Sequence, residues 1–170
     1  MPAGRRPRSL RTWLIKRGTA ATLELTAALA KAGPPWQQRA TATIRAFGAL
    51  AARLRGINRG DAASPERLGA TWQRAFPAKK QVPIVSVDAT TAYGEIHTRC
   101  PLRGSGDVEA CHRMMAYDRA FMERAGGRFV VLRSQAEPGV TVCQVAIRAA
   151  SLPADDLVPA VERAGRPTKP

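Results

Sequence analysis

GDVEACHRMMAYDRAFMERAGGRFVVLRSQAEPGVTVCQVAIR, residues 106–148, contains the strongest signals for secondary structure in this chain. Its first part predicts a helix over 107–125, because apolar residues recur there at three- and four-residue spacing. Gly126-Gly127 ends that helix, since glycine adopts the left-handed conformation of a helix C-terminal cap without steric cost. We therefore expect one helix that leads directly into the strands after it.

The second part of the stretch predicts a β-hairpin. Strands over 129–134 and 140–148 are joined through Glu137-Pro138-Gly139, a strong turn signal. Earlier in the chain, 84–87 and 94–98 also have the composition of strands. The expected fold class is α+β, in which N-terminal helices precede a small antiparallel sheet of about four strands with the 107–125 helix packed across it.

Composition divides the chain into a basic helical region over 1–60, an α+β domain over 61–150 and a Pro-rich tail over 151–170. The first region predicts helices over 10–31 and 36–55. In the second of these helices, apolar residues follow a helical spacing, which indicates a face for core or partner contact. Its members are Trp36, Ala40, Ile44, Phe47, Ala51 and Leu54.

The net charge of +14 is unevenly placed. Residues 1–60 hold twelve Lys and Arg against one acid, Glu24, which gives +11. The other 110 residues hold fifteen basic and twelve acidic residues, which gives +3. This asymmetry suggests an acidic partner for the basic helices, which is nucleic acid, a membrane surface or, as the accessory-protein interpretation has it, an acidic protein. The simpler interpretation is that the arginines only solvate helices. Nucleic acid is not the expected partner, because no recognition-helix, zinc-finger or stacking-aromatic motif accompanies the charge.

Location is inferred from the cysteines and from hydropathy. No run approaches the ~18 apolar residues that a transmembrane helix needs. Three cysteines are an odd number and too few for a disulfide-built scaffold. A reducing cytoplasm is therefore the expected compartment.

Residues able to carry chemistry gather in one quarter of the chain. All three cysteines (Cys100, Cys111 and Cys143) and His112 lie between positions 100 and 143, and His97 precedes Cys100 by three residues. Cys111 lies one turn into the predicted helix, where the helix dipole is expected to lower its pKa and favour the thiolate. The segment is therefore the candidate site.

Three interpretations of this cluster stay open. A metal is one candidate cofactor: either zinc, because its tetrahedral sites accept mixed sulfur and nitrogen ligands, or iron in an Fe–S cluster on the same thiols, although such clusters usually take four cysteines. The candidate metal ligands are His97, Cys100, Cys111, His112 and Cys143. Alternatively, a thiolate acts as a nucleophile while a carboxylate on the same helix face, Asp118, orients the substrate. In the third interpretation the cysteines only pack in the core.

A strand leads into Cys100-Pro101, Cys111 precedes Asp118 by seven residues, and a Gly-Gly break leads to a hairpin that ends in Gly139-x-x-x-Cys143. This pattern resembles the L-2-amino-thiazoline-4-carboxylic acid hydrolase-like family over residues 64–149. It is more faintly similar to the small-molecule-binding domains related to bacteriochlorophyll 4-vinyl reductase. The resemblance implies an α+β domain that opens a small cyclic amidine, aminothiazoline carboxylate, to a carbamoyl-cysteine.

Chemistry on such a substrate needs a nucleophile, a group for the cationic amidine, a cation for the substrate carboxylate and a proton carrier. Cys111 or Cys143 is the expected nucleophile, and Asp118 the expected amidine partner. Arg133 or Arg99 is expected to bind the carboxylate, and His97 or His112 to move protons. The alternative functions are a non-catalytic module that binds a metal or a small ligand, and an accessory protein that docks a larger complex through its basic helices.

Overall fold

The computed structural model describes residues 10–165, except for the side chains of 10–17, 19, 20 and 61. The described chain contains six α-helices, two short 3₁₀ helices (Arg59–Ala63 and Lys79–Gln81) and four β-strands. The α-helices are α1 (Leu10–Ala30), α2 (Gln37–Leu54), α3 (Pro65–Gln73), α4 (Val108–Met114), α5 (Ala116–Arg124) and α6 (Ala160–Ala164). The strands are β1 (Ile84–Val87), β2 (Thr91–Ile96), β3 (Gly127–Arg133) and β4 (Cys143–Ala149).

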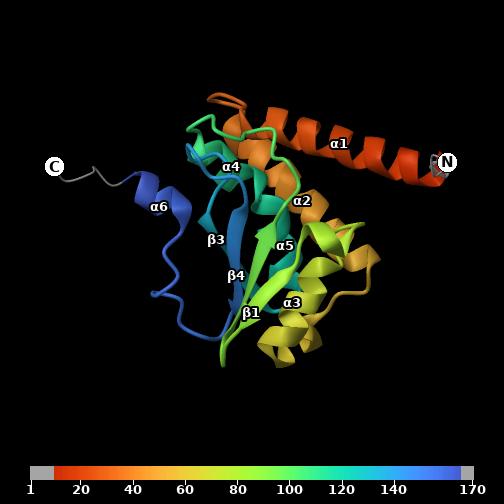
Figure 1. Cartoon of the computed structure of the whole chain (residues 1–170), viewed down its shortest axis with the longest axis vertical. Coiled ribbons are helices and arrows are strands. Elements are labelled where there is room, and N and C mark those ends of the chain that lie inside the picture. The colour runs from red at the N-terminus through yellow and green to blue at the C-terminus, as the bar shows by residue number, and fades with distance from the viewer. Residues whose placement is uncertain (1–9, 166–170) are drawn as a thin grey trace, which may run out of the picture.

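The strands form one antiparallel sheet in the order β1-β2-β4-β3, so β3 is an edge strand. Helices α3 and α5 pack on one face, α2 packs against α5, and α1 crosses the top of the molecule (Figure 1). The segment that leads to α6 lies on the other side of the sheet. The predicted α+β class and the antiparallel sheet are confirmed.

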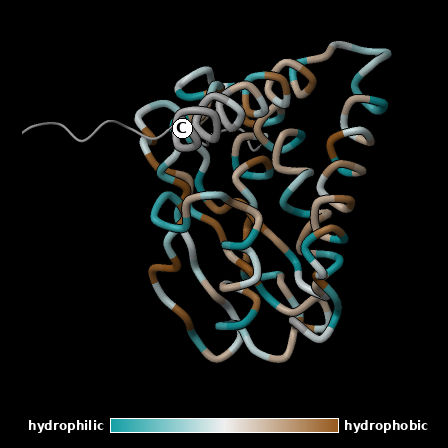
Figure 2. Tube along the Cα trace, turned by 90° about the vertical axis from the view of Figure 1, so that its right-hand side faces the viewer, coloured by the Kyte–Doolittle hydropathy of each residue, from teal (hydrophilic) through white to brown (hydrophobic). Residues whose placement is uncertain are grey.

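The central strand β4 is covered on both faces along most of its length. Cys143, Val145 and Ile147 are buried and face the helices, whereas Ala146 and Arg148 are buried on the opposite face and only Gln144 is exposed. Apolar and polar stretches follow one another along the chain (Figure 2). Successive side chains of a strand point to opposite faces, so the Cys143, Val145 and Ile147 side of β4 belongs to the core between sheet and helices.

The helix predicted over 107–125 is two helices, because the chain changes direction at Met115, which ends α4 and begins α5. Met114, Met115 and Ala116, which lie at this break, are all buried. The predicted glycine cap is present at Gly126, whose φ is +79°.

Only part of the apolar face predicted on the second helix is buried. In α2 the buried residues include Ala40, Ile44 and Ala51, whereas Phe47 and Leu54 are exposed. Helix α5 approaches α2 closely at Gly48, where an added Cβ would collide with the Tyr117 carbonyl group. Within residues 10–165, no helix is both long and apolar enough to cross a membrane.

The tail after residue 150 is held more closely than its proline content suggests. The Arg148 guanidinium donates to both Asp156 carboxylate oxygens, at 2.6 and 2.7 Å, and to the Pro153 carbonyl oxygen at 2.6 Å. Arg163 of α6 donates to the Leu132 carbonyl oxygen on the free edge of β3. These bonds place α6 beside the edge strand, while residues 166–170 lie outside the described part.

Candidate functional site

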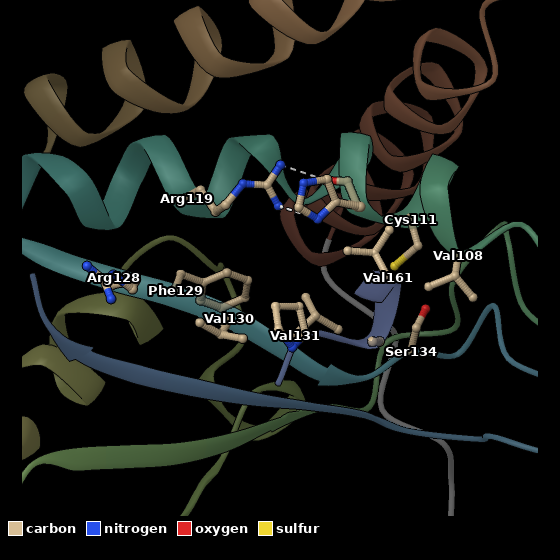
Figure 3. Close-up of a pocket in the computed structure, with 12 residues that line it drawn as sticks. Val108, Cys111, Arg119, Arg128, Phe129, Val130, Val131, Ser134 and Val161 are labelled. Atoms are coloured by element: carbon tan, nitrogen blue, oxygen red, sulfur yellow. Dashed lines mark hydrogen bonds between the residues drawn. The ribbon is translucent and has the colours of Figure 1, made fainter. Parts of the chain in front are cut away.

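A cavity of about 220 Å³ lies along the edge strand β3, between α4 and α5 on one side and the start of α6 on the other (Figure 3). Most of its walls are apolar, and its polar side chains come from four separate segments of the chain. The described lining residues are Val108, Cys111, His112, Arg119, Arg128, Phe129, Val130, Val131, Ser134, Pro159, Ala160 and Val161. We call it the Cys111 cavity.

Cys111 supplies the thiol of this cavity. Asp107 caps α4 by accepting a hydrogen bond from the Ala110 amide at 2.8 Å, which places Cys111 one turn further along. The thiol points toward the Ser134 hydroxyl (Figure 3). Burial raises the pKa of Cys111 to about 12, against a smaller lowering effect of Ser134. The thiolate expected from the helix dipole is therefore not favoured, because desolvation exceeds the field of a seven-residue helix.

His112 and Arg119 form the polar side of the cavity. Arg119 Nη2 donates to the His112 carbonyl oxygen at 2.7 Å, and its Nη1 lies 3.5 Å from His112 Nδ1. Burial, followed by the charges of Arg119 and Arg113, lowers the pKa of His112. The imidazole is thus neutral at pH 7, the form that can accept a proton.

Two cations face the cavity without acidic partners. Arg119 and Arg128 line it, and none of the described lining residues is Asp or Glu. No ion pair in the described chain involves either arginine. Burial lowers the pKa of Arg119, which indicates that water solvates its charge incompletely. Such a cavity favours a ligand that carries a negative charge.

Cys100 and Cys143 lie at a different, smaller cavity of about 70 Å³ together with Arg99. Cys143 Sγ accepts a hydrogen bond from the Gln135 amide at 3.2 Å, and Cys100 Sγ accepts one from Leu102 at 3.4 Å. Burial raises the pKa of Cys143 to about 11 and also raises that of Cys100. Both sulfurs therefore act as buried hydrogen-bond acceptors and remain protonated at neutral pH.

The Gln135 side chain forms hydrogen bonds with several segments around this second cavity. Nothing in the sequence predicted this role of Gln135. Its Oε1 accepts from the Cys100 amide at 3.1 Å and from Arg103 Nε at 2.9 Å. Its Nε2 donates to the carbonyl oxygens of Ile96 and Thr98 at 3.0 and 2.9 Å. A glutamine after a strand is ordinarily solvent-exposed, and only the fold shows that this one is fully buried.

Asp118 is turned toward the core. Its Oδ1 accepts a hydrogen bond from Trp72 Nε1 at 3.1 Å, and it lines neither the Cys111 cavity nor the smaller one. Burial raises the pKa of Asp118 to about 6, against a lowering effect of the Trp72 hydrogen bond. In this structure its partner is the Trp72 indole.

The remaining predicted site residues are dispersed. Arg133 is exposed on β3, and His97 is exposed with its Nε2 2.8 Å from Glu95 Oε2. Among residues 10–165, no three His, Cys, Asp or Glu side chains form a group that could hold a metal ion. The five predicted zinc or iron ligands thus do not form one ligand set here, because α4 and the sheet direct them to different surroundings.

Sequence reasoning overlooked the two arginines of the Cys111 cavity. Arg119 follows His112 by seven residues, two helical turns, so the helical period alone was a usable signal. Arg128 carried no comparable signal, because its position depends on how β3 passes the ends of the helices. Comparisons with family models, curated proteins and solved structures found no match to this chain.

Proposed function

We propose that the chain is a hydrolase of a small cyclic amidine that bears a carboxylate, of the aminothiazoline carboxylate type, and that it acts in the Cys111 cavity. One observation carries this proposal: a thiol, a neutral imidazole and two unpaired guanidinium groups line one cavity of about 220 Å³. A volume of this size suits a single small ring. The sequence resemblance supplies the substrate class.

Arg119 and Arg128 bind the substrate carboxylate in this proposal, in place of Arg133 or Arg99, because only the first two line the Cys111 cavity. A guanidinium group forms short, charge-assisted hydrogen bonds with carboxylates, and these are stronger where water is excluded. Arg119 is already oriented by the His112 carbonyl oxygen. The substrate carboxylate would form an ion pair with the half-buried Arg119, which forms none with the described residues.

Cys111 is the proposed nucleophile and His112 the proposed base. Cys111 Sγ forms a bond to the amidine carbon, and the thiol proton passes to the His112 imidazole. The ring C–S bond then breaks, and the leaving sulfur takes up that proton. Water adds to the same carbon and the bond to Cys111 breaks, so one water is consumed and a carbamoyl-cysteine leaves. A base is needed because the Cys111 thiol, with its pKa raised to about 12, is protonated beforehand.

A non-catalytic module that binds a small anion is the second candidate. Burial raises the pKa of all three thiols, and Asp118 is engaged by Trp72. These observations favour binding without turnover, since no preformed thiolate and no free carboxylate face the ligand. The two candidates share the arginines and differ in whether Cys111 reacts.

The test is turnover of 2-aminothiazoline-4-carboxylate, measured by release of a new thiol, together with calorimetric binding of the same compound. Hydrolysis is expected for the unmodified chain and is expected to be lost in Cys111→Ala with binding retained. Arg119→Gln is expected to weaken binding by about tenfold or more, since a charged hydrogen bond contributes about 1.5–3 kcal/mol. Arg133→Gln, an exposed arginine on the same strand as Arg128, is the matched control.

Binding that depends on Arg119 without release of thiol would establish the binding module instead. If the chain shows no turnover and no binding that depends on Arg119, both candidates are refuted. Loss of binding in Arg133→Gln, with Arg119→Gln unaffected, would restore the carboxylate site that the sequence first suggested.

A further inference from the structure

A groove runs between α1 and α2 on the side of the molecule away from the Cys111 cavity. Two adjoining cavities of about 380 and 250 Å³ make up this groove. They share four lining residues: Thr22 and Thr26 of α1, Phe47 of α2, and Tyr117 of α5. The backbone of the N-terminal half of α1 extends beyond the rest of the protein (Figure 1). We call this groove the α1–α2 groove.

Exposed apolar side chains border the groove. Leu25 on α1 is 63% exposed, and Phe47, Leu50 and Leu54 on α2 are 53%, 51% and 78% exposed. The three α2 residues follow one another at spacings of three and four, so they form a single stripe beside the buried face of the helix. A continuous apolar surface of this kind on a soluble domain marks an interaction site.

The charge around the stripe is positive. Residues Gln37–Leu54 of α2 contain arginines and no acidic residue. Arg39 and Arg53 fall next to the apolar stripe on the helix surface, and Arg55 lines the larger cavity. Glu24, the single acid of residues 1–60, falls on the far side of α1 from Thr22 and Thr26 by helical geometry. The surroundings of the groove therefore select an acidic partner.

The shape of the groove selects among acidic partners. Its floor is formed by Tyr117 and Met114, which lie below the level of the exposed stripe. A flat lipid surface in contact with Leu50 and Leu54 would leave that floor empty. A second copy of the chain would bring another net charge of +14 to the same place and would be repelled. A helix, by contrast, can insert side chains at successive turns.

We propose that the α1–α2 groove binds an amphipathic α-helix of a partner protein, with the apolar face of that helix in the groove and Asp or Glu along its flanks. The partner's apolar side chains occupy the two cavities and cover Phe47, Leu50 and Leu54. Its carboxylates pair with Arg39, Arg53 and Arg55. This interaction is separate from chemistry at the Cys111 cavity.

A phage-displayed library of helical peptides tests this proposal on the full-length protein. The peptides have leucine and phenylalanine fixed along one face and flanking positions randomised among Glu, Gln and Lys. Selection is expected to enrich Glu at the flanks. An enriched peptide, made synthetically, is expected to bind about tenfold more weakly to Leu54→Asp or Leu50→Asp, because exposed apolar anchors dominate such contacts. Raised salt is expected to weaken binding further.

Val85→Asp is the matched control, since Val85 is an equally exposed apolar residue on β1 and belongs to neither cavity. Unchanged binding in this variant and in Cys111→Ala is expected. Enrichment of Gln or Lys at the flanks, no enrichment at all, or binding that survives Leu54→Asp would overturn the proposal. Leu54-dependent binding to vesicles of phosphatidylcholine and phosphatidylserine, with no peptide bound, would assign the surface to lipid instead.

Discussion

Asp118 and Trp72 form a buried side-chain pair in which the carboxyl group changes its charge near pH 6. The carboxyl is buried with the Trp72 indole as its hydrogen-bond donor, and burial raises its pKa to about 6. A carboxyl group with a raised pKa keeps its proton up to a higher pH in the folded state than in the unfolded state. The folded protein therefore loses stability as the pH rises from about 4 to about 6.

The first prediction is that Asp118 lowers the free energy of unfolding by up to about 3 kcal/mol between pH 4 and pH 7. This figure follows from a rise of about two pKa units, at 1.36 kcal/mol each. In Asp118→Asn this part of the pH dependence is expected to vanish, because the amide keeps an acceptor for Trp72 and does not titrate. Urea unfolding at several pH values, followed by tryptophan fluorescence, measures the difference.

Asp88→Asn is the control for that prediction, since Asp88 is exposed and hydrogen bonds to Thr90 and Thr91 lower its pKa. Because its pKa is lowered, Asp88 contributes stability that increases as the pH rises, the opposite of Asp118. In Asp88→Asn this contribution is expected to be absent, while the contribution of Asp118 stays unchanged. An Asp118→Asn variant that kept the full pH dependence of the unmodified chain would contradict the assignment of the slope to Asp118.

At the scale of elements, the contact between α2 and α5 depends on the absence of a side chain. Gly48 lies where a Cβ would meet the Tyr117 carbonyl group, so the two helices approach more closely than side chains ordinarily allow. The same approach brings the rings of Phe47 and Tyr117 to 5.7 Å between centroids.

The second prediction is that Gly48→Ala destabilises the protein by about 1–3 kcal/mol, because overpacking forces the helices apart. Gly18→Ala on α1 is the matched control. No atom lies within 4 Å of a Cβ at that position, and alanine is the better helix former. Chemical denaturation of the two variants measures the difference. Equal stability of both variants would show that α2 and α5 separate without cost.

The division of the predicted 107–125 helix at Met115 also belongs to this scale. It turns Cys111 and His112 on α4 toward the edge of β3, while α5 presents Asp118 to the core and Arg119 to the same edge. In one straight helix, Cys111 and Asp118 share a face. The break separates them and brings Cys111 together with Arg119 instead.

At the scale of the whole molecule, the basic N-terminal helices and the sheet domain share one core. Buried residues of α1 and α2, such as Ala30, Ile44 and Ala52, belong to the same hydrophobic cluster as Phe121 on α5 and Val145 on β4. Removal of the first 60 residues would expose the outer face of α5, where Tyr117 and Phe121 stack with ring centroids 6.3 Å apart.

The third prediction is that residues 61–170 alone do not show a cooperative unfolding transition, because the apolar surface of α5 loses its cover. Thermal and urea unfolding by circular dichroism, compared with the full chain, test this expectation. A sharp transition for the shortened chain would instead establish 61–150 as an independent domain, as composition alone suggested.

Features that depend on near neighbours in the chain could be predicted from the residues alone. The glycine at position 126, the turn Glu137-Pro138-Gly139 and the composition of the strands predict the helix end, the hairpin and the sheet. Each rests on the conformational preferences of particular residues. The antiparallel α+β fold followed from these local signals.

The composition of the candidate site depends on tertiary packing. The Cys111 cavity joins residues of α4, α5, β3 and the segment before α6, and no local pattern records that meeting. The partner of Asp118 lies 46 positions earlier in the chain. The raised pKa of each thiol likewise comes from desolvation, which depends on how the whole chain packs around the sulfur. The sequence thus shows which residues could carry chemistry. The protonation state of the cysteines and the partner of Asp118 can be assigned only from the folded structure.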